Sequence, residues 1–294
     1  MPIDRQHYNE KLVLDSFRTS FWLDRDRPWY VAYNLTDLIL YSIPHFVPRK
    51  FKHSLDSSTL PMEQYSIYYD RVDEVEFDGN YSKASIRYMH IQRVILSTMI
   101  FDENLLDLSK VEYLCVKSSA YPLKKLFEMI RRSMIGLYHL DIQYPLSLVQ
   151  FRDDVLPLEQ IRILNVSHSP DSIDLSLLFP SIEYLTIGIS HLHQMAQLID
   201  RLKHLSSASF HLTNPSNTAD QILTDSDKIR QWLQEKSTRL STDNRFTCRL
   251  EKSLQISIHL WMSNERSSLV SRRLTTERMT TRNKTKSRCV CSLQ

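Results

Sequence analysis

A cysteine, a histidine and an aspartate occur in an order that could support nucleophilic chemistry. Cys115 would be the nucleophile, His139 the base, and Asp141 the group that orients the base. The strand pattern described below places Cys115 and His139 on adjacent strands, with all three side chains on one face. However, the sequence has no local nucleophile motif and no device for an oxyanion hole beside them. We therefore predict that the protein is not an enzyme and has no catalytic residues.

The sequence offers equally little to a metal ion or a cofactor. Cys289 and Cys291 form a C-x-C pair that has no partner ligands nearby, and the four cysteines show no framework spacing. The chain contains only three glycines, and none forms a glycine-rich phosphate turn after an apolar strand segment. We expect no metal and no cofactor.

The elements that must position these residues follow an apolar pattern with steps of three, three and two. Leu108, Val111, Leu114 and Val116 form one copy, and the chain has seven. The third apolar positions of the copies are Val75, Val94, Leu114, Leu140, Leu164, Leu185 and Ala208. The intervals between them are 19, 20, 26, 24, 21 and 23 residues. A unit of this length with an L-x-x-L-x-L core is typical of a leucine-rich repeat, which has one short strand per unit.

Stacking explains why such a pattern forms a single core. Alternate residues of a strand share a face, so one unit cannot bury its apolar pair without a neighbour. Between strands, residues 123–134 and 191–204 have one-sided apolar stripes typical of helices. We therefore predict an α/β fold: a leucine-rich-repeat-like solenoid with short parallel strands on the concave face and helices or turns on the convex face. Another kind of parallel α/β sheet is the alternative, although most of the links between strands are short for it.

The repeats resemble those of F-box/leucine-rich-repeat proteins, which are irregular and lack a uniform asparagine. After the apolar triplet that family favours Asn, Cys, Ser or Thr, and five of the seven sites here fit. They are Asn80, Ser119, Ser169, Ser190 and Thr213, whereas Met99 and Pro145 depart from the pattern. Residues Trp232–Glu235, Phe246–Cys248 and Ile256–Trp261 also resemble the closing section of such proteins.

The resemblance implies a substrate receptor of an F-box type ubiquitin ligase. Its partners would be a protein or peptide ligand on the concave face and a cullin-ligase adaptor. No F-box is visible in this chain, so a stand-alone leucine-rich-repeat scaffold or inhibitor with no link to a ubiquitin ligase is the alternative.

The strand register also predicts which side chains meet a partner. Those expected to bind it are Glu74, Glu76, Asp78, Arg93, Tyr113, Lys117, His139, Asp141, Asn165 and Tyr184. The first strand is wholly acidic on this face, and the tyrosines supply apolar anchors among polar groups. Two interpretations of the acidic strand stay open. The strand contacts a basic ligand, or its carboxylates are solvated and prevent edge pairing.

The remaining segments are expected to cover the ends of the solenoid. Residues 1–68 would form an N-terminal cap, with an aromatic hairpin built from 21–23 and 29–33 and a surface loop at the basic run 49–53. The solenoid would occupy 69–213. Residues 214–264 would form a C-terminal cap with a helix, interrupted at 225–227, and a strand over 254–261 that closes the far edge, and 265–294 would be a disordered basic tail.

Composition limits the environment and the class of partner. The chain has 294 residues, of which 42% are hydrophobic, and its formal net charge is +3. The basic tail carries much of the positive charge, and the rest of the chain lacks the excess of basic residues that a nucleic-acid-binding protein shows. We therefore expect no nucleic-acid partner. The aromatic hairpin and the tail are the features that a nucleic-acid-binding or catalytic protein would use instead. With no signal peptide and no long apolar run, we expect no membrane partner and a cytoplasmic or nuclear location.

Overall fold

The structure is a computed structural model that describes part of the chain. The described residues are 12–19, 30–34, 39–43, 50–53, 57–58, 72–77, 88–97, 106–119, 122–146, 156–168, 174–213, 225–242, 246–252 and 256–262. Asp78 and the whole of 265–294 lie outside them. In the described part, no helix is both long and apolar enough to cross a membrane.

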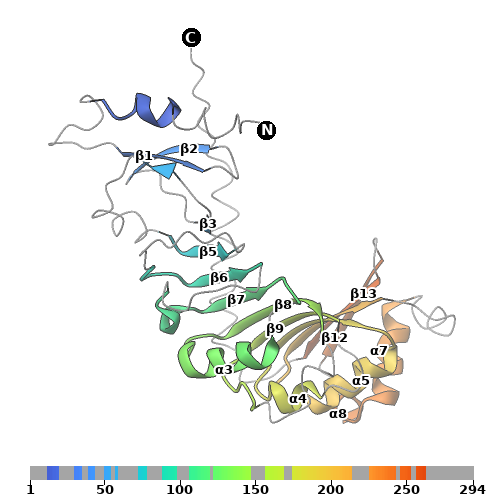
Figure 1. The fold of residues 1–294 in the computed structure, drawn as a ribbon. Helices are drawn as coiled ribbons and strands as arrows, with labels where there is room; N and C mark the ends of the chain where they lie inside the picture. The colour runs from blue at the N-terminus through green and yellow to red at the C-terminus, as the bar shows by residue number, and fades with distance from the viewer. Residues whose placement is uncertain are drawn as a thin grey trace, which may run out of the picture.

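A 10-stranded open sheet organises the molecule (Figure 1). Its strands in spatial order are β3 (Lys50–His53), β5 (Glu74–Phe77), β6 (Arg93–Leu96), β7 (Tyr113–Val116), β8 (His139–Pro145), β9 (Ile163–His168), β10 (Tyr184–Ile189), β11 (Ser207–Leu212), β13 (Ile256–Met262) and β12 (Phe246–Lys252). Every neighbouring pair from β3 to β11 is parallel. The last two pairings, β11 with β13 and β13 with β12, are antiparallel.

The apolar triplets fix the register of the parallel part. Val75, Val94, Leu114, Leu140, Leu164, Leu185 and Ala208 lie side by side in one row. All of them are at most 2% exposed. The predicted stacking of these residues is therefore confirmed, and each strand buries its apolar pair against the next.

Helices cover one face of this sheet (Figure 1). They are α3 (Leu123–Ser133), α4 (Leu175–Leu178), α5 (Leu192–Arg201), α7 (Ser226–Lys236) and α8 (Thr238–Thr242), with a 3-10 turn, η3 (Leu108–Lys110), before β7. Leu126 and Ile130 of α3 and Met195 and Ile199 of α5 are fully buried, and they share one core with the inward strand residues. The predicted helices at 123–134 and 191–204 are confirmed, as is the mixed α/β class.

The C-terminal end differs from the prediction in two respects. The strand expected over 254–261 exists as β13, but it does not close the edge, because β12 pairs with its other side. The prediction for 214–264 held a single strand, so it missed β12. Helix α7 begins at the predicted interruption: the Asp225 side chain accepts a hydrogen bond from the Asp227 amide and caps it. The part of the predicted helix before Asp225 lies outside the described residues.

A reciprocal polar contact ties α8 to α5. Asp200 of α5 accepts hydrogen bonds from Ser237 Oγ at 2.6 Å and from the Thr238 and Arg239 amides. These amides stand at the start of α8, where the helix itself offers them no acceptor. Arg239 in return donates to the carbonyl oxygens of Leu202 and Leu205 at the end of α5. Partial burial alone would raise the pKa of Asp200, but these hydrogen bonds hold it below its ordinary value.

The N-terminal segment is only partly described. Residues 12–16 are helical, and β1 (Tyr30–Asn34) pairs antiparallel with both β2 (Ile39–Ile43) and β4 (Ser57–Ser58). Strand β1 matches the second half of the predicted aromatic hairpin, whereas residues 21–29 lie outside the described residues. The surface loop expected at 49–53 is wrong, because Lys50–His53 is strand β3 and pairs with β5. The main sheet therefore includes a strand from the segment assigned to the cap.

Candidate partner-binding face

The sheet face away from the helices, which we call the open face, carries three rows of side chains. The first row is Glu74, Arg93, Tyr113, His139, Ile163, Tyr184, Ser207, Trp261 and Thr247. The second row is Glu76, Ile95, Cys115, Asp141, Asn165, Thr186, Ser209, His259 and Arg249. The third row includes Ser97, Lys117, Gln143, Ser167, Gly188, His211, Ser257 and Glu251. The structure thus brings together all the predicted partner-binding residues that it describes.

A continuous chain of contacts follows the first row from β5 to β8 and ends on Asn165, a second-row residue of β9. Arg93 Nε donates to Glu74 Oε2 at 2.8 Å, and the Arg93 guanidinium lies 4.2 Å from the centre of the Tyr113 ring. The Tyr113 ring in turn packs edge-on against His139 at 4.6 Å. His139 Nε2 lies 3.0 Å from Asn165 Nδ2. These contacts hold the side chains in fixed positions, as a preformed surface requires.

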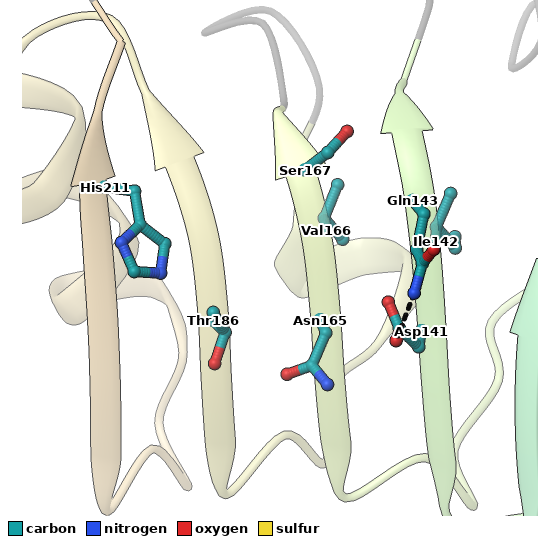
Figure 2. A pocket seen from close by; sticks show the side chains of 8 residues that line it. All are labelled: Asp141, Ile142, Gln143, Asn165, Val166, Ser167, Thr186 and His211. Atoms are coloured by element: carbon teal, nitrogen blue, oxygen red, sulfur yellow. Dashed lines mark hydrogen bonds between the residues drawn. The ribbon is translucent and has the colours of Figure 1, made fainter. Parts of the chain in front are cut away.

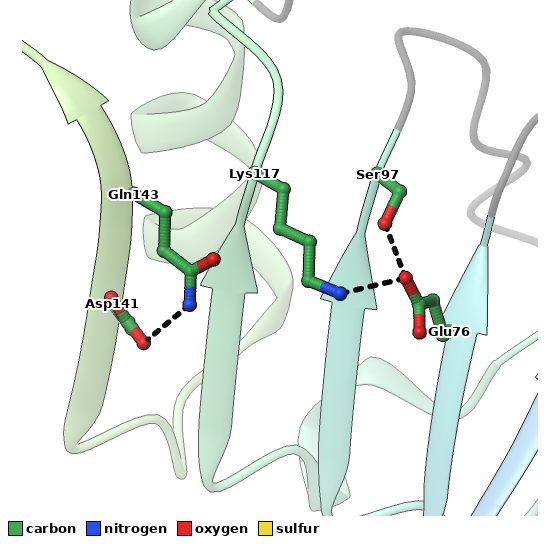
Figure 3. Close-up of polar contacts among 5 residues, drawn as sticks. All are labelled: Glu76, Ser97, Lys117, Asp141 and Gln143. Carbon is green, nitrogen blue, oxygen red and sulfur yellow. Dashed lines mark hydrogen bonds and ion pairs between the residues drawn. The ribbon is translucent and has the colours of Figure 1, made fainter.

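The acidic character predicted for the first strand is neutralised within the sheet (Figure 3). Lys117 reaches across β6 and places Nζ 2.8 Å from Glu76 Oε1. Ser97 Oγ donates to the same oxygen at 2.6 Å. Since Glu74 is bound by Arg93, neither described carboxylate of β5 is an unpaired charge that could attract a basic partner. Asp78, the third predicted acid, lies outside the described residues.

His139 is held in its neutral form. Burial and then the nearby positive charge of Arg93 lower its pKa to about 4. A neutral ring leaves Nε2 able to accept a hydrogen bond from the Asn165 amide. This assignment leaves the Asn165 carbonyl oxygen, Oδ1, free to face the next strand.

The cysteine considered as a nucleophile is poorly suited to that role. Cys115 was expected to be exposed on this face, but it is 1% exposed. Burial and then the Asp141 carboxylate raise the pKa of its thiol to about 12, which disfavours the reactive thiolate. The Nε2 atom of His139 is hydrogen-bonded to the Asn165 amide and not to the Cys115 thiol. Glu74 and Ile163 are likewise buried, at 8% and 7% exposed.

A hollow of about 320 Å³ opens in the middle of the open face (Figure 2). Polar side chains from four strands line it: Asp141, Gln143, Asn165, Ser167, Thr186 and His211. The hollow lies where the pairing of the strand backbones changes. The β8–β9 register shifts between Ile142 and Pro145, and the β9–β10 pairing ends at Val166 with Ile187.

Gly188 is required beside this hollow. A Cβ atom at Gly188 would lie 2.0 Å from the carbonyl oxygen of Ser167, which is closer than real side chains approach. The strand β10 therefore carries no side chain at the third row, between Ser167 and His211. The glycine instead lets the backbones of β10 and β9 come close together beside the hollow.

Asp141 sits at the bottom of one side of the hollow. Its Oδ2 accepts hydrogen bonds from Tyr113 Oη and from Gln143 Nε2, both at 3.2 Å. Figures 2 and 3 show the bond from Gln143. Among the described residues, no Lys or Arg nitrogen lies within ion-pair distance of this carboxylate, whereas Glu74 and Glu76 each have a cation. Asp141 therefore brings an uncompensated negative charge to the open face.

Sequence reasoning missed the part of the open face that β13 and β12 supply. Ser209 bonds with His259 at 2.9 Å, and His211 bonds with Ser257 at 2.8 Å. Trp261, which is 46% exposed, stacks on His259 of the same strand, and β11 separates that strand from β10, which carries Tyr184. The alternation of 256–261 was visible in the sequence, but its pairing with β11 was not.

Across the described ranges, no cluster of three or more His, Cys, Asp or Glu side chains is arranged to hold a metal ion. No protein-family model matches the sequence, and no match is found among curated proteins.

Proposed function

We propose that the chain is a recognition module that binds an extended segment of a partner protein along its open face. The observation that carries this proposal is the open face itself. Successive strands present polar and aromatic side chains around a preformed hollow, and none of the described helices covers them.

The composition of the face supports binding of protein over catalysis. Tyr113, Tyr184 and Trp261 are aromatic residues of the kind enriched in protein interfaces, and they lie among polar side chains. The groups that a hydrolytic site would use are neutral and occupied: a thiol of raised pKa and a histidine bonded to an amide. A partner would therefore meet hydrogen-bonding groups already oriented, which lowers the entropic cost of binding.

We further propose that the fold is a leucine-rich-repeat-like solenoid. The equal register of the parallel strands and the short return segments support this assignment. The resemblance of the repeats to those of F-box proteins then leads to a role in choosing substrates for a cullin-type ubiquitin ligase. Co-precipitation of the full chain with the ligase adaptor tests that role, and a partner complex without the adaptor would favour the stand-alone scaffold or inhibitor.

Selection of linear peptides from a random library on the immobilised full chain tests recognition. We expect peptides whose binding is lost when Thr186 on the open face is replaced by Arg, since a long charged side chain would fill the hollow. The control is Lys124→Glu, which changes an exposed residue of α3 on the helix side. An absence of binding peptides, or binding that is lost only in the α3 variant, would contradict the proposal.

A further inference from the structure

The hydrogen-bonding groups around the hollow point to a specific ligand group. We infer that the hollow receives an arginine side chain of the partner, with its guanidinium paired to Asp141 and hydrogen-bonded to the oxygens around it. This inference rests on the proposed function and adds the chemical identity of the residue that the open face selects.

The first argument is the balance of donors and acceptors. The Gln143 and Asn165 amides each have one N–H engaged, with Asp141 and with His139, and among the described residues neither amide oxygen has a hydrogen-bond partner. In Figure 2 the Asn165 oxygen faces the strand that carries Thr186. The hydrogen bonds that Tyr113 Oη and Gln143 Nε2 donate to Asp141 both end on Oδ2, which leaves Oδ1 of this carboxylate, beside the Cys115 thiol, able to accept from a ligand. These oxygens suit a ligand that brings several N–H donors.

The second argument is charge. Asp141 is the carboxylate among the lining residues, and in the described part of the chain it has no cation partner. Lys117, the nearest cation in the third row, is engaged by Glu76 on the far side of β6. Burying an unpaired carboxylate under a neutral or acidic partner would cost free energy, whereas a cation would recover it.

The third argument separates arginine from lysine. The acceptors come from two adjacent strands, β8 and β9, and so lie apart, with the hydroxyls of Ser167 and Thr186 at the margin. A guanidinium has five N–H donors spread over a plane and can reach several of these oxygens at once. A lysine ammonium is a compact group whose three donors diverge from one point, so it satisfies fewer of them.

The peptides selected on the full chain also test this inference. We expect an arginine at one fixed position, and about tenfold weaker binding when that residue is replaced by citrulline, which keeps the shape but loses the charge. The variant Asp141→Asn should weaken the arginine peptide by a similar factor, because it keeps the oxygen that Tyr113 and Gln143 contact but removes the charge. Ser167→Asp adds a second carboxylate at an exposed margin and should strengthen binding severalfold.

The matched control is Glu128→Gln, which makes the same charge change at an exposed residue of α3 on the helix side of the sheet. It should leave the affinity within about twofold. Peptides that bind the open face but carry no fixed arginine, or an arginine peptide that binds Asp141→Asn as well as wild type, would overturn the inference and leave the proposed recognition intact. A failure of every peptide to bind would instead count against the proposed function itself.

Discussion

Acidification should destabilise the fold through His139. Its pKa lies at about 4 in the folded state, against about 6.5 in an unfolded chain. Between these values the unfolded state binds more protons, so stability is complete above pH 6.5 and is lost as the pH falls toward 4. From the two pKa values, linkage gives a loss of about 2 kcal/mol between pH 7.5 and pH 5.

The assay is urea unfolding at several pH values for the wild type and for His139→Gln. Glutamine has no titrating group here, and its side-chain oxygen can replace the ring nitrogen as acceptor for Asn165. Other residues, such as His211, whose pKa burial and then His259 lower, titrate in both proteins. The difference between the two pH profiles therefore isolates His139.

We expect the wild type to lose about 2 kcal/mol more than the variant over this range. Equal losses in the two proteins would refute the reasoning, because they would mean that His139 is protonated as easily in the folded chain as in the unfolded one. A folded-state pKa near 6.5 for His139, measured by NMR titration, would refute it independently.

Three further changes test the packing. Leu114→Asp should unfold the chain or lower its free energy of unfolding in urea by more than about 4 kcal/mol, because a carboxylate would enter the fully buried row of strand residues. Melting of this variant at the wild-type temperature would reject the strand register. Gly188→Ala should lower the free energy of unfolding by more than about 1 kcal/mol, because the new Cβ would clash with the Ser167 carbonyl. Gly136→Ala, whose Cβ would lie 3.1 Å from the nearest atom, should lower it less. The reverse order would contradict the close approach at Gly188. Arg239→Met should lower stability by about 1 to 3 kcal/mol, since the carbonyl oxygens at the end of α5 lose a charged donor, and an unchanged unfolding midpoint would show that the contact between α5 and α8 is not needed.

The sequence was sufficient for the parallel sheet because its signal is repeated. Each copy of the triplet supports the same register, so an irregular interval, such as the 26 residues between Leu114 and Leu140, does not disturb the row. Single, short elements lack that support. Strand β3 is four residues long and lies in a basic run, and β12 alternates only through Phe246, Cys248 and Leu250. Both were missed, although each pairs with a strand that was predicted.

The residues of the open face could be predicted from the same register, but their partners could not. Alternation determines that Glu76 and Lys117 point to one side, yet the ion pair depends on a side chain long enough to cross β6. The hollow lies where the backbone pairing shifts after Ile142, and the close approach at Gly188 lies beside it. Neither feature leaves a periodic trace in the sequence. Burial of Cys115 depends on the surrounding side chains and not on its position along the strand.

The ion pairs of Glu74 with Arg93 and of Glu76 with Lys117 have a kinetic consequence. Opposite charges 2.8 Å apart act as small dipoles, whose field decays within a few ångströms and is weak at the Debye length of about 8 Å in physiological salt. This part of the surface would therefore not draw a charged partner in from a distance. Encounter there should proceed at the ordinary diffusional rate, nearly independent of ionic strength, so that selectivity would appear in how slowly the complex dissociates.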